Sequence, residues 1–378
     1  MTRKLYRLVP VAFVIAALSF ALHAWNGAKT ASEAETRGAN AGYRKFSDES
    51  FDSFDTLVTF TAFTRDEAEF GRYAKIVRDE MGRLHRLFDI YHEYEGLINL
   101  KTINDAAGIA PVQADTDIMN LLELAKEAYD DTGGAFNVAL GPVLAIWHDR
   151  RAAAANGVVS APSAEELQSA AVHISARDIR IDRENSTVFL PYGDMRLDVG
   201  AVAKGYAAQR AADMLRRSGL ASGIINAGGN VVIIGPPLDG RETWSVGVHA
   251  PTDDGDMSKL LDVLYLKDGS AVTSGSDQRY FIADDRRYHH IIDPQTLFPA
   301  DGLKSVTVLH NNSSLADILS TAAFILPMNE ARALLARHGA EAMWMTEDGE
   351  TMATEGYKRA SKVEREKSAG EMKAGGEL

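Results

Sequence analysis

The sequence predicts an α+β fold, and three features support that prediction. Short segments rich in β-branched and aromatic residues are interleaved with separate helical segments along most of the chain. These segments do not form the long βαβ series of a doubly wound parallel sheet. The 378 residues, 46% of them hydrophobic and 25% charged, are enough for one large core or two modest ones.

The expected elements follow from local composition and periodicity. In order they are a strand at 57–63, a helix at 66–88, a helix at 118–129, a hairpin formed by 179–181 and 187–190, a helix at 201–218, strands at 244–248, 261–266 and 306–309, and a helix at 315–325. Thr132, Gly133 and Gly134 end the second helix. A Gly-flanked strand is also expected after the helix at 201–218.

The two ends of the chain differ from its middle. Residues 1–25 carry Arg3, Lys4 and Arg7 before an apolar run, which predicts a secretion signal, either cleaved or retained as a membrane anchor. Residues 26–50 read as a linker, 51–350 as the folded domain, and 351–378 as a charged, disordered tail. The basic flank places the domain in the periplasm, free or anchored to the inner membrane.

Charge and cysteine content exclude several classes of function. The formal net charge of −13 gives no broad positive field, so nucleic acid is not an expected partner. The chain has no cysteine, which rules out disulfides, thiolate metal ligands, a cysteine nucleophile and lipid attachment at a cysteine.

The first segment with candidate chemistry runs from Leu197 to Tyr206. It reads as a strand that ends in Asp198 and Gly200 and continues into a helix, whose free N–H groups and Lys204 suit a phosphate. The alternative is that the glycine only serves a strand-to-helix turn. A second segment, residues 225–231, has a double glycine that fits a hairpin turn, or a backbone that a ligand approaches closely.

The third set lies near the C-terminus. Asp317 and Thr321 are four residues apart, so a helix places both oxygens on one face, as a Mg²⁺ site requires. Asp317 as a helix N-cap is the alternative. His290 is the candidate base for an incoming hydroxyl, with Asp293 as its orienting partner. Because His289 and His290 point opposite ways on a strand, only one of them can face the site.

Taken together, these segments resemble the ApbE-like family of FAD:protein FMN transferases over residues from about 51 to 340. The matching motifs are Thr132-Gly133-Gly134-Ala135-Phe136-Asn137 with Gly141-Pro142 and Trp147, Leu197-Asp198 through Lys204-Gly205-Tyr206, Asn226-Ala227-Gly228-Gly229-Asn230, Thr273-Ser274-Gly275, His290-Ile291-Ile292-Asp293-Pro294, and Ala316-Asp317 with Ser320-Thr321. The resemblance implies mostly antiparallel sheets flanked by helices in two closely packed subdomains, a T-fold-like arrangement.

The resemblance also implies a substrate, a metal and a reaction. The FAD site is expected to be lined by Phe54, Tyr91, Ala135, Phe136, Asn137, Asp198, Lys204 and Ile292. The Ala201 carbonyl, the Asp317 carboxylate and the Thr321 hydroxyl are expected to hold Mg²⁺. The family product is FMN joined by a phosphoester to a Thr or Ser of a partner protein, with AMP leaving. The partner would be a flavoprotein subunit of an exported or membrane redox complex.

Three positions depart from the family pattern. Phe54-Asp55-Thr56 replaces a Met-Gly-Thr triplet, Asn137 replaces an acid, and Glu93-Tyr94-Glu95 replaces an Asp-Ser pair near Tyr91. Phe54 keeps an apolar contact surface, and Asn137 keeps a hydrogen-bond acceptor. Two other functions are compatible with the same motifs: an FAD pyrophosphatase that releases FMN and AMP, and a non-catalytic flavin-binding maturation factor.

Overall fold

The computed structural model describes residues 42–252 and 258–366, and from Tyr43 onward these residues form one compact unit. The predicted signal or anchor at 1–25 lies outside the described residues, as does most of the predicted linker. Among the residues described, no helix has both the length and the apolar character needed to cross a membrane.

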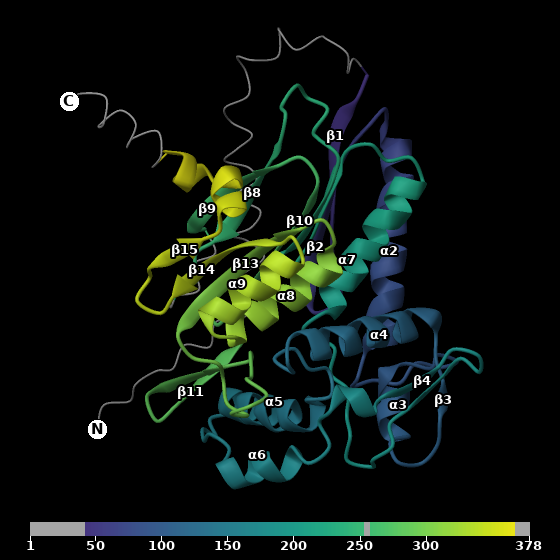
Figure 1. The fold of residues 1–378 in the computed structure, drawn as a ribbon. Helices are drawn as coiled ribbons and strands as arrows, with labels where there is room; N and C mark the ends of the chain where they lie inside the picture. Colours follow the sequence, from purple (N-terminus) through teal and green to yellow (C-terminus); the bar gives the residue numbers. More distant parts are fainter. Residues whose placement is uncertain (1–41, 253–257, 367–378) are drawn as a thin grey trace, which may run out of the picture. The chain divides into compact units, whose positions relative to one another are not determined.

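The centre of the fold is an eight-stranded sheet in which every pairing is antiparallel. Its strands, in spatial order, are β1 (Arg44–Ser53), β2 (Thr56–Thr64), β6 (Gly223–Ala227), β7 (Asn230–Ile234), β10 (Gly269–Gly275), β13 (Leu303–His310), β14 (Glu341–Thr346) and β15 (Thr351–Ala353). Helices come between several of these strands in sequence (Figure 1). This arrangement confirms the predicted α+β class.

One face of the sheet is covered by helices. They are α2 (Glu67–Phe88), α7 (Ala203–Arg217), α8 (Ser313–Ile325) and α9 (Met328–Arg337) (Figure 1). Asp66 caps α2 through Glu69 N–H, and Asn312 caps α8 through Leu315 N–H. The main hydrophobic core lies between these helices and the sheet.

The opposite face carries a hairpin, β8 (Trp244–His249) with β9 (Leu260–Leu266), and the short helix α10 (Glu355–Ala360). Strand β7 is buried along its whole length because it packs on both faces. Its residues alternate as a strand requires: Val232 and Ile234 belong to the main core, and Val231 and Ile233 to the cluster beneath the hairpin.

A smaller group of elements lies beyond one end of the large sheet in Figure 1. It comprises α3 (Leu100–Asp105), β3 (Val112–Gln113), α4 (Thr116–Asp131), α5 (Gly141–Ala155), α6 (Ala164–Ala170), the 3₁₀ helix η1 (Ala176–Asp178), β4 (Arg180–Asp182) and β5 (Thr187–Phe189). The hairpin of β11 (Tyr280–Ala283) and β12 (Arg286–His289) packs on α5. Trp147 holds this contact, because its ring stacks on Tyr288 at 5.5 Å.

Two predicted boundaries are wrong. The predicted linker at 26–50 overlaps β1, so the fold begins before residue 51. Because β1 is an edge strand with an exposed face, its sequence lacks the apolar alternation by which a strand is predicted. The predicted disordered tail at 351–378 begins with β15 and α10, and Tyr357 of α10 is fully buried. This segment is ordered by the pairing of β15 with β14 and by the packing of Tyr357, Ala353 and Ala360 on the cluster beneath the β8–β9 hairpin.

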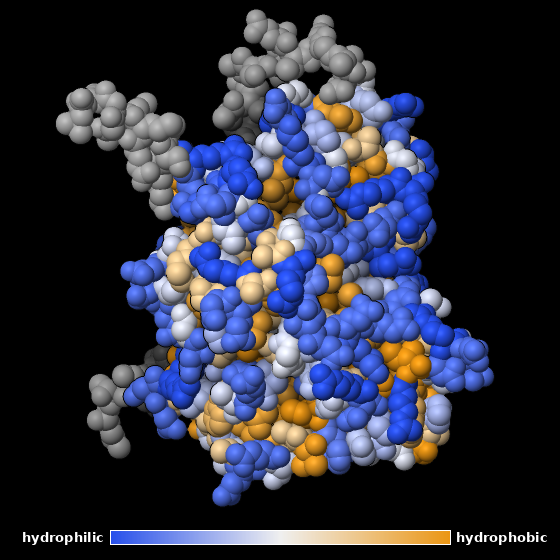
Figure 2. Space-filling view, in the orientation of Figure 1, coloured by the Kyte–Doolittle hydropathy of each residue, from blue (hydrophilic) through white to orange (hydrophobic). Residues whose placement is uncertain are grey.

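The surface in the view of Figure 1 is mainly hydrophilic, with small hydrophobic areas between charged side chains (Figure 2). This is the surface expected of a chain with 25% charged residues.

Candidate active site

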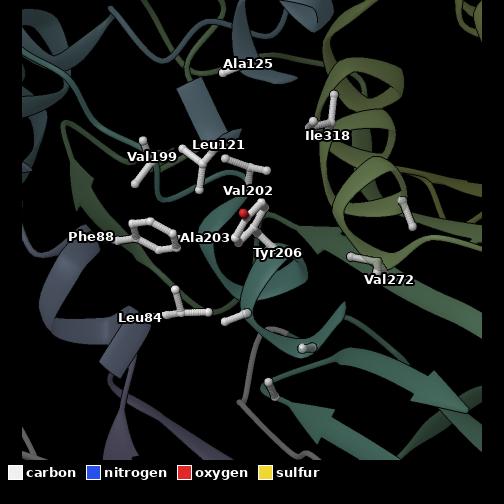
Figure 3. Packing of buried hydrophobic residues seen from close by; sticks show 14 of the residues in the cluster. Leu84, Phe88, Leu121, Ala125, Val199, Val202, Ala203, Tyr206, Val272 and Ile318 are labelled. Atoms are coloured by element: carbon white, nitrogen blue, oxygen red, sulfur yellow. The ribbon is translucent and has the colours of Figure 1, made fainter. Parts of the chain in front are cut away.

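The N-terminal turn of helix α7 is the element around which the site is built. Leu197, before this turn, exchanges two hydrogen bonds with the Asn104 side chain, at 2.7 and 3.0 Å. The predicted strand at this point is therefore wrong: the segment bonds the Asn104 side-chain amide and, through the Asp198 N–H, the Val138 carbonyl at 2.8 Å, and it belongs to no sheet. Figure 3 shows Val199, Val202, Ala203 and Tyr206 packed among Leu84, Phe88 and Leu121.

Asp317 supplies the cap that helix α7 lacks. The N-cap residue of α7, Val202, has no capping side chain. Asp317 in α8 is buried, and its Oδ2 accepts the Gly205 N–H at 2.8 Å. Asn312 caps α8, so the alternative that Asp317 is the N-cap of its own helix is wrong. Asp317 instead joins the two helices.

Gly205 is required where these helices meet. A Cβ at this position would lie 2.5 Å from the Ser313 carbonyl oxygen and 2.6 Å from the Asp317 Cβ. Burial raises the pKa of the Asp317 carboxyl, and the Lys204 charge and the Gly205 N–H oppose that effect. Lys204 is therefore close enough to act on Asp317.

Hydroxyl groups gather beside Asp317. Ser274, near the end of β10, lies 2.8 Å from Ser320 Oγ and 3.5 Å from Thr321 Oγ1. Ser320 also donates to the Asp317 carbonyl at 2.9 Å. All the possible metal ligands here are oxygen atoms. Gly205 bonds only Oδ2 of Asp317, so Oδ1 is the second carboxylate oxygen that could bind a metal. This set, with Ala201 one turn before Gly205, has the chemistry that Mg²⁺ prefers.

His289 is the last residue of β12 and His290 follows the strand, so the predicted alternation of the two on one strand is wrong, and both line one small cavity. His289 is buried and structural: its Nε2 bonds the Ala300 carbonyl oxygen at 2.8 Å and its Nδ1 accepts the Ile291 N–H. The Nδ1 of His290 is buried with no hydrogen-bond partner in the described part of the chain. Burial, with the charges of Arg279, His289 and Lys204, lowers the pKa of His290 to about 3.

Asp293 does not orient His290 through any hydrogen bond between described residues. Its Oδ1 accepts the Gln295 N–H at 2.8 Å, and its backbone closes the same turn with Leu297 and Phe298. The carboxylate therefore stabilises the turn after the histidine pair.

Tyr91 and Asp198 lie near each other at the side of the site. The Tyr91 hydroxyl bonds His148 Nδ1 at 2.8 Å, and its side chain is 61% exposed, which leaves ring surface for a flat ligand. Burial of the hydroxyl and the Asp198 charge raise the pKa of Tyr91 to about 12. Asp198 itself accepts the Gly200 N–H at 2.8 Å.

Several predicted FAD-lining residues are buried. Phe136, 1% exposed, belongs to the main core, and Ile292 belongs to the cluster around Trp147. Ala135 is also buried. Asn137 uses its amide locally, donating to the Ile174 carbonyl and accepting the Ala139 N–H.

The turn between β6 and β7 packs against the turn between β1 and β2. Gly228 and Gly229 form the two-residue turn between β6 and β7, which bears out the hairpin interpretation of this motif. A Cβ on Gly228 would lie 2.1 Å from Thr56 Oγ1, so this turn packs against the one holding Phe54. The Phe54 N–H donates to His85 Nδ1 at 3.2 Å.

Three basic side chains beside His290 were missed by sequence reasoning. His148 and Arg151 on α5 and Arg279 before β11 line one small cavity with His290 and His289. The spacing of His148 and Arg151, three residues apart on a helix, was the only available signal. Their convergence with Arg279 depends on the tertiary fold.

The fold and the site define an α+β protein with a buried carboxylate and neighbouring hydroxyls at a helix N-terminus, and with cationic side chains around His290. The chain belongs to the ApbE family, which matches residues 54–344 and confirms the resemblance.

Relatives and solved structures agree with this membership. The FAD:protein FMN transferase of Treponema pallidum is 35% identical over 309 residues, covering 75% of this chain and 83% of that protein. That of Klebsiella pneumoniae is 34% identical over 287 residues, covering 72% and 85%. The ApbE protein of Thermotoga maritima superposes with a TM-score of 0.73 at 29% identity, covering 84% of this chain and all of that one. The flavin transferase ApbE of Vibrio cholerae gives 0.71 at 20% identity, a likeness of fold.

Proposed function

We propose that this protein is an FAD:protein FMN transferase that moves the FMN half of FAD to a Thr or Ser hydroxyl of a partner protein. The observation that carries the proposal is that three distant segments meet at the N-terminus of α7. Asp317 bonds Gly205, and the charge of Lys204 acts on both Asp317 and His290. The names of the relatives support the same activity.

The reaction exchanges the phosphoanhydride bond of FAD for a phosphoester bond to the acceptor. The acceptor oxygen forms a bond to the phosphorus of the FMN half, and the bond from that phosphorus to the bridging oxygen breaks. AMP leaves with the bridging oxygen and its electron pair, and the hydroxyl proton passes to a base. The nucleophile belongs to the partner, so this chain supplies binding, charge and proton transfer.

His290 is suited to receive the proton once the phosphates are bound. Its Nδ1 has no partner in the described structure, so it is free to accept a hydrogen bond. Nearby cations contribute to the low pKa of His290 in the free protein. Bound phosphates oppose those charges, which raises the pKa of His290 towards the range useful for a base.

The oxygens of Asp317, Thr321 and Ala201 are proposed to hold Mg²⁺. The metal, when bound, neutralises phosphate charge that builds up as the bond to AMP breaks. Asp317 also fixes the first turn of α7 and so positions Lys204, which lies beside Gly205. Tyr91 is proposed to present its exposed ring to a flat part of FAD.

We further propose that the protein acts outside the inner membrane, on a flavoprotein subunit of an exported or membrane redox complex. The basic and apolar composition of residues 1–25 supports this placement. Fusion of a reporter enzyme that is active only in the periplasm tests it: activity supports export, and an inactive but intact fusion contradicts it.

Transfer is tested by incubating the protein with FAD, Mg²⁺ and a candidate flavin-carrying protein, and by following intact mass and AMP. The expected result is a mass gain of FMN less water on the acceptor, lost with EDTA and reduced at least about a hundredfold in Asp317→Ala. Asp301→Ala, an exposed carboxylate, is the matched control. FMN released without an adduct would indicate a pyrophosphatase, and FAD binding without AMP a maturation factor.

A further inference from the structure

Arg151 and Arg279 are two guanidinium groups that come together beside His290. Arg151 lies on α5, and Arg279 lies between β10 and β11. Both line the cavity that contains His290. Each arginine also lowers the pKa of His290, which agrees with short separations among the three.

Neither guanidinium forms a hydrogen bond or ion pair with any residue that the structure describes. The next residue on α5, Arg150, shows what a paired arginine looks like here: it bonds both oxygens of Glu166, at 2.9 and 2.7 Å. Carboxylates exist near the pair, since the charges of Asp198 and Asp149 act on His148. None of them lies within ion-pair distance of either arginine, so both can bind a ligand.

The pair is held in place by its supporting elements. Trp147, one turn before Arg151, packs on Phe281 and Tyr288 of the β11–β12 hairpin. His148, on the same face of α5 as Arg151, bonds the Tyr91 hydroxyl at 2.8 Å. These contacts fix the backbone next to both arginines, so two like charges remain together although they repel each other.

We propose that Arg151 and Arg279 bind the phosphate groups of the dinucleotide, as a cationic contact in addition to Lys204. Guanidinium groups suit phosphate because their planar N–H donors match two phosphate oxygens at once. The pair, Lys204 and His290 together would surround the phosphorus that is attacked. This inference rests on the proposed function, because FAD is the ligand.

The test measures the affinity of the full-length protein for FAD by quenching of flavin fluorescence. The variants are Arg151→Gln, Arg279→Gln and the double substitution. Arg150→Gln and Arg286→Gln are matched controls, because they remove paired arginines from the same helix and the same hairpin. Each test variant is expected to weaken FAD binding about tenfold to a hundredfold, the loss of a charge-assisted hydrogen bond, and the controls about twofold or less.

Three further readouts separate phosphate binding from a structural effect. Inorganic pyrophosphate is expected to displace FAD from the wild type and to lose this effect in the double variant. Riboflavin, which lacks phosphate, is expected to bind all variants equally, and a parallel loss of riboflavin binding overturns the proposal. Arg279→Lys is expected to recover part of the affinity. Melting temperatures should equal or exceed that of the wild type, since each substitution removes a like-charge repulsion.

The outcomes also distinguish this inference from the proposed function. If the wild type binds FAD through the arginines but transfers no FMN, phosphate binding by the pair is supported and the transferase function is contradicted. If FMN transfer occurs and the variants bind FAD as the wild type does, phosphate binding by the pair is contradicted and the transferase function is supported. An increase only in the KM for the acceptor protein means that the pair binds an acceptor carboxylate, which also overturns the proposal.

Discussion

Phe54 and Asp55 form the two-residue turn between β1 and β2, with φ values of 57° and 50°. Both angles lie in the left-handed region, where a side chain is unfavourable by about 1–2 kcal/mol, less for Asp than for Phe. The family motif has glycine at the position of Asp55. The Phe54 N–H bond to His85 and the packing of Phe54 against that ring hold the turn in this conformation.

Asp55→Gly is expected to raise the free energy of unfolding by about 0.5 kcal/mol, because relief of the left-handed strain exceeds the entropy cost of glycine. Urea denaturation measures it. Glu49→Gly, at an exposed paired position in β1, is the control and should lower stability by about 0.5–1 kcal/mol. A loss of stability in Asp55→Gly would mean that the aspartate side chain stabilises the turn more than its backbone angle destabilises it.

At the scale of elements, the site depends on the close approach of α7 and α8. Gly205 permits this approach and Asp317 uses it to cap α7. A second set of polar contacts holds α7 from the other side, where Tyr206 donates to Asp117 at 2.8 Å and Arg210 lies 3.2 Å from the same carboxylate oxygen. The N-terminus of α7 is thus fixed by buried groups from α4 and α8.

Gly205→Ala is expected to destabilise the protein by about 1–3 kcal/mol, because the added Cβ forces α7 and α8 apart. It should also weaken FMN transfer, since Asp317 and Lys204 shift together. Gly71→Ala is the matched control: Gly71 is exposed in α2, has no atom within 4 Å of its missing Cβ, and should gain about 1 kcal/mol. Equal effects of the two substitutions on stability would contradict the tight contact.

The local sequence pattern was sufficient to predict the long helices and the central strands. The predicted helix at 66–88 and strand at 57–63 agree with α2 and β2 within one residue at each end. The edge strand β1 was missed because most of its residues are exposed and show no apolar alternation, and the segment around Tyr357 was missed because its order comes from the β8–β9 hairpin, which is distant in sequence. The extended segment at Leu197 was predicted as a strand because its unusual partner, Asn104, cannot be read from composition.

The same limit applies to the site. The spacing of Asp317 and Thr321 could be read from sequence, since it follows from the period of one helix, whereas the predicted strand alternation does not apply to His290, which lies just beyond the end of β12. The capping of α7 by Asp317 and the meeting of Arg151 with Arg279 could not, because each joins segments more than a hundred residues apart. Phe136 and Ile292 are buried, which motif membership alone did not reveal.

At the scale of the whole molecule, the site is a group of positive charges in an acidic protein. The net charge of −13 repels anions in general, whereas Arg151, Arg279 and Lys204 attract them at one place. In the absence of a ligand, burial and these charges together lower the pKa of His290 and favour its neutral form. Because folding and protonation are linked, a histidine that stays neutral in the folded protein makes the protein less stable at acid pH.

Between pH 6.5 and about 3, the unfolded chain takes up a proton at His290 that the folded protein refuses, because the pKa of His290 falls from 6.5 to about 3 on folding. The stability that His290 contributes is therefore complete above pH 6.5 and decreases as the pH falls towards 3. His290→Gln is expected to lose stability less steeply over this interval than the wild type, as measured by denaturant unfolding at a series of pH values.

His249→Gln serves as the control for this comparison, because His249 is an exposed histidine on β8. Pyrophosphate provides an independent check: an anion that offsets Arg151, Arg279 and Lys204 makes protonated His290 easier to accommodate in the folded protein. It should therefore reduce the pH dependence of the wild type and have no such effect on His290→Gln. Parallel curves for the wild type and His290→Gln without ligand would show that His290 is not held neutral by its surroundings.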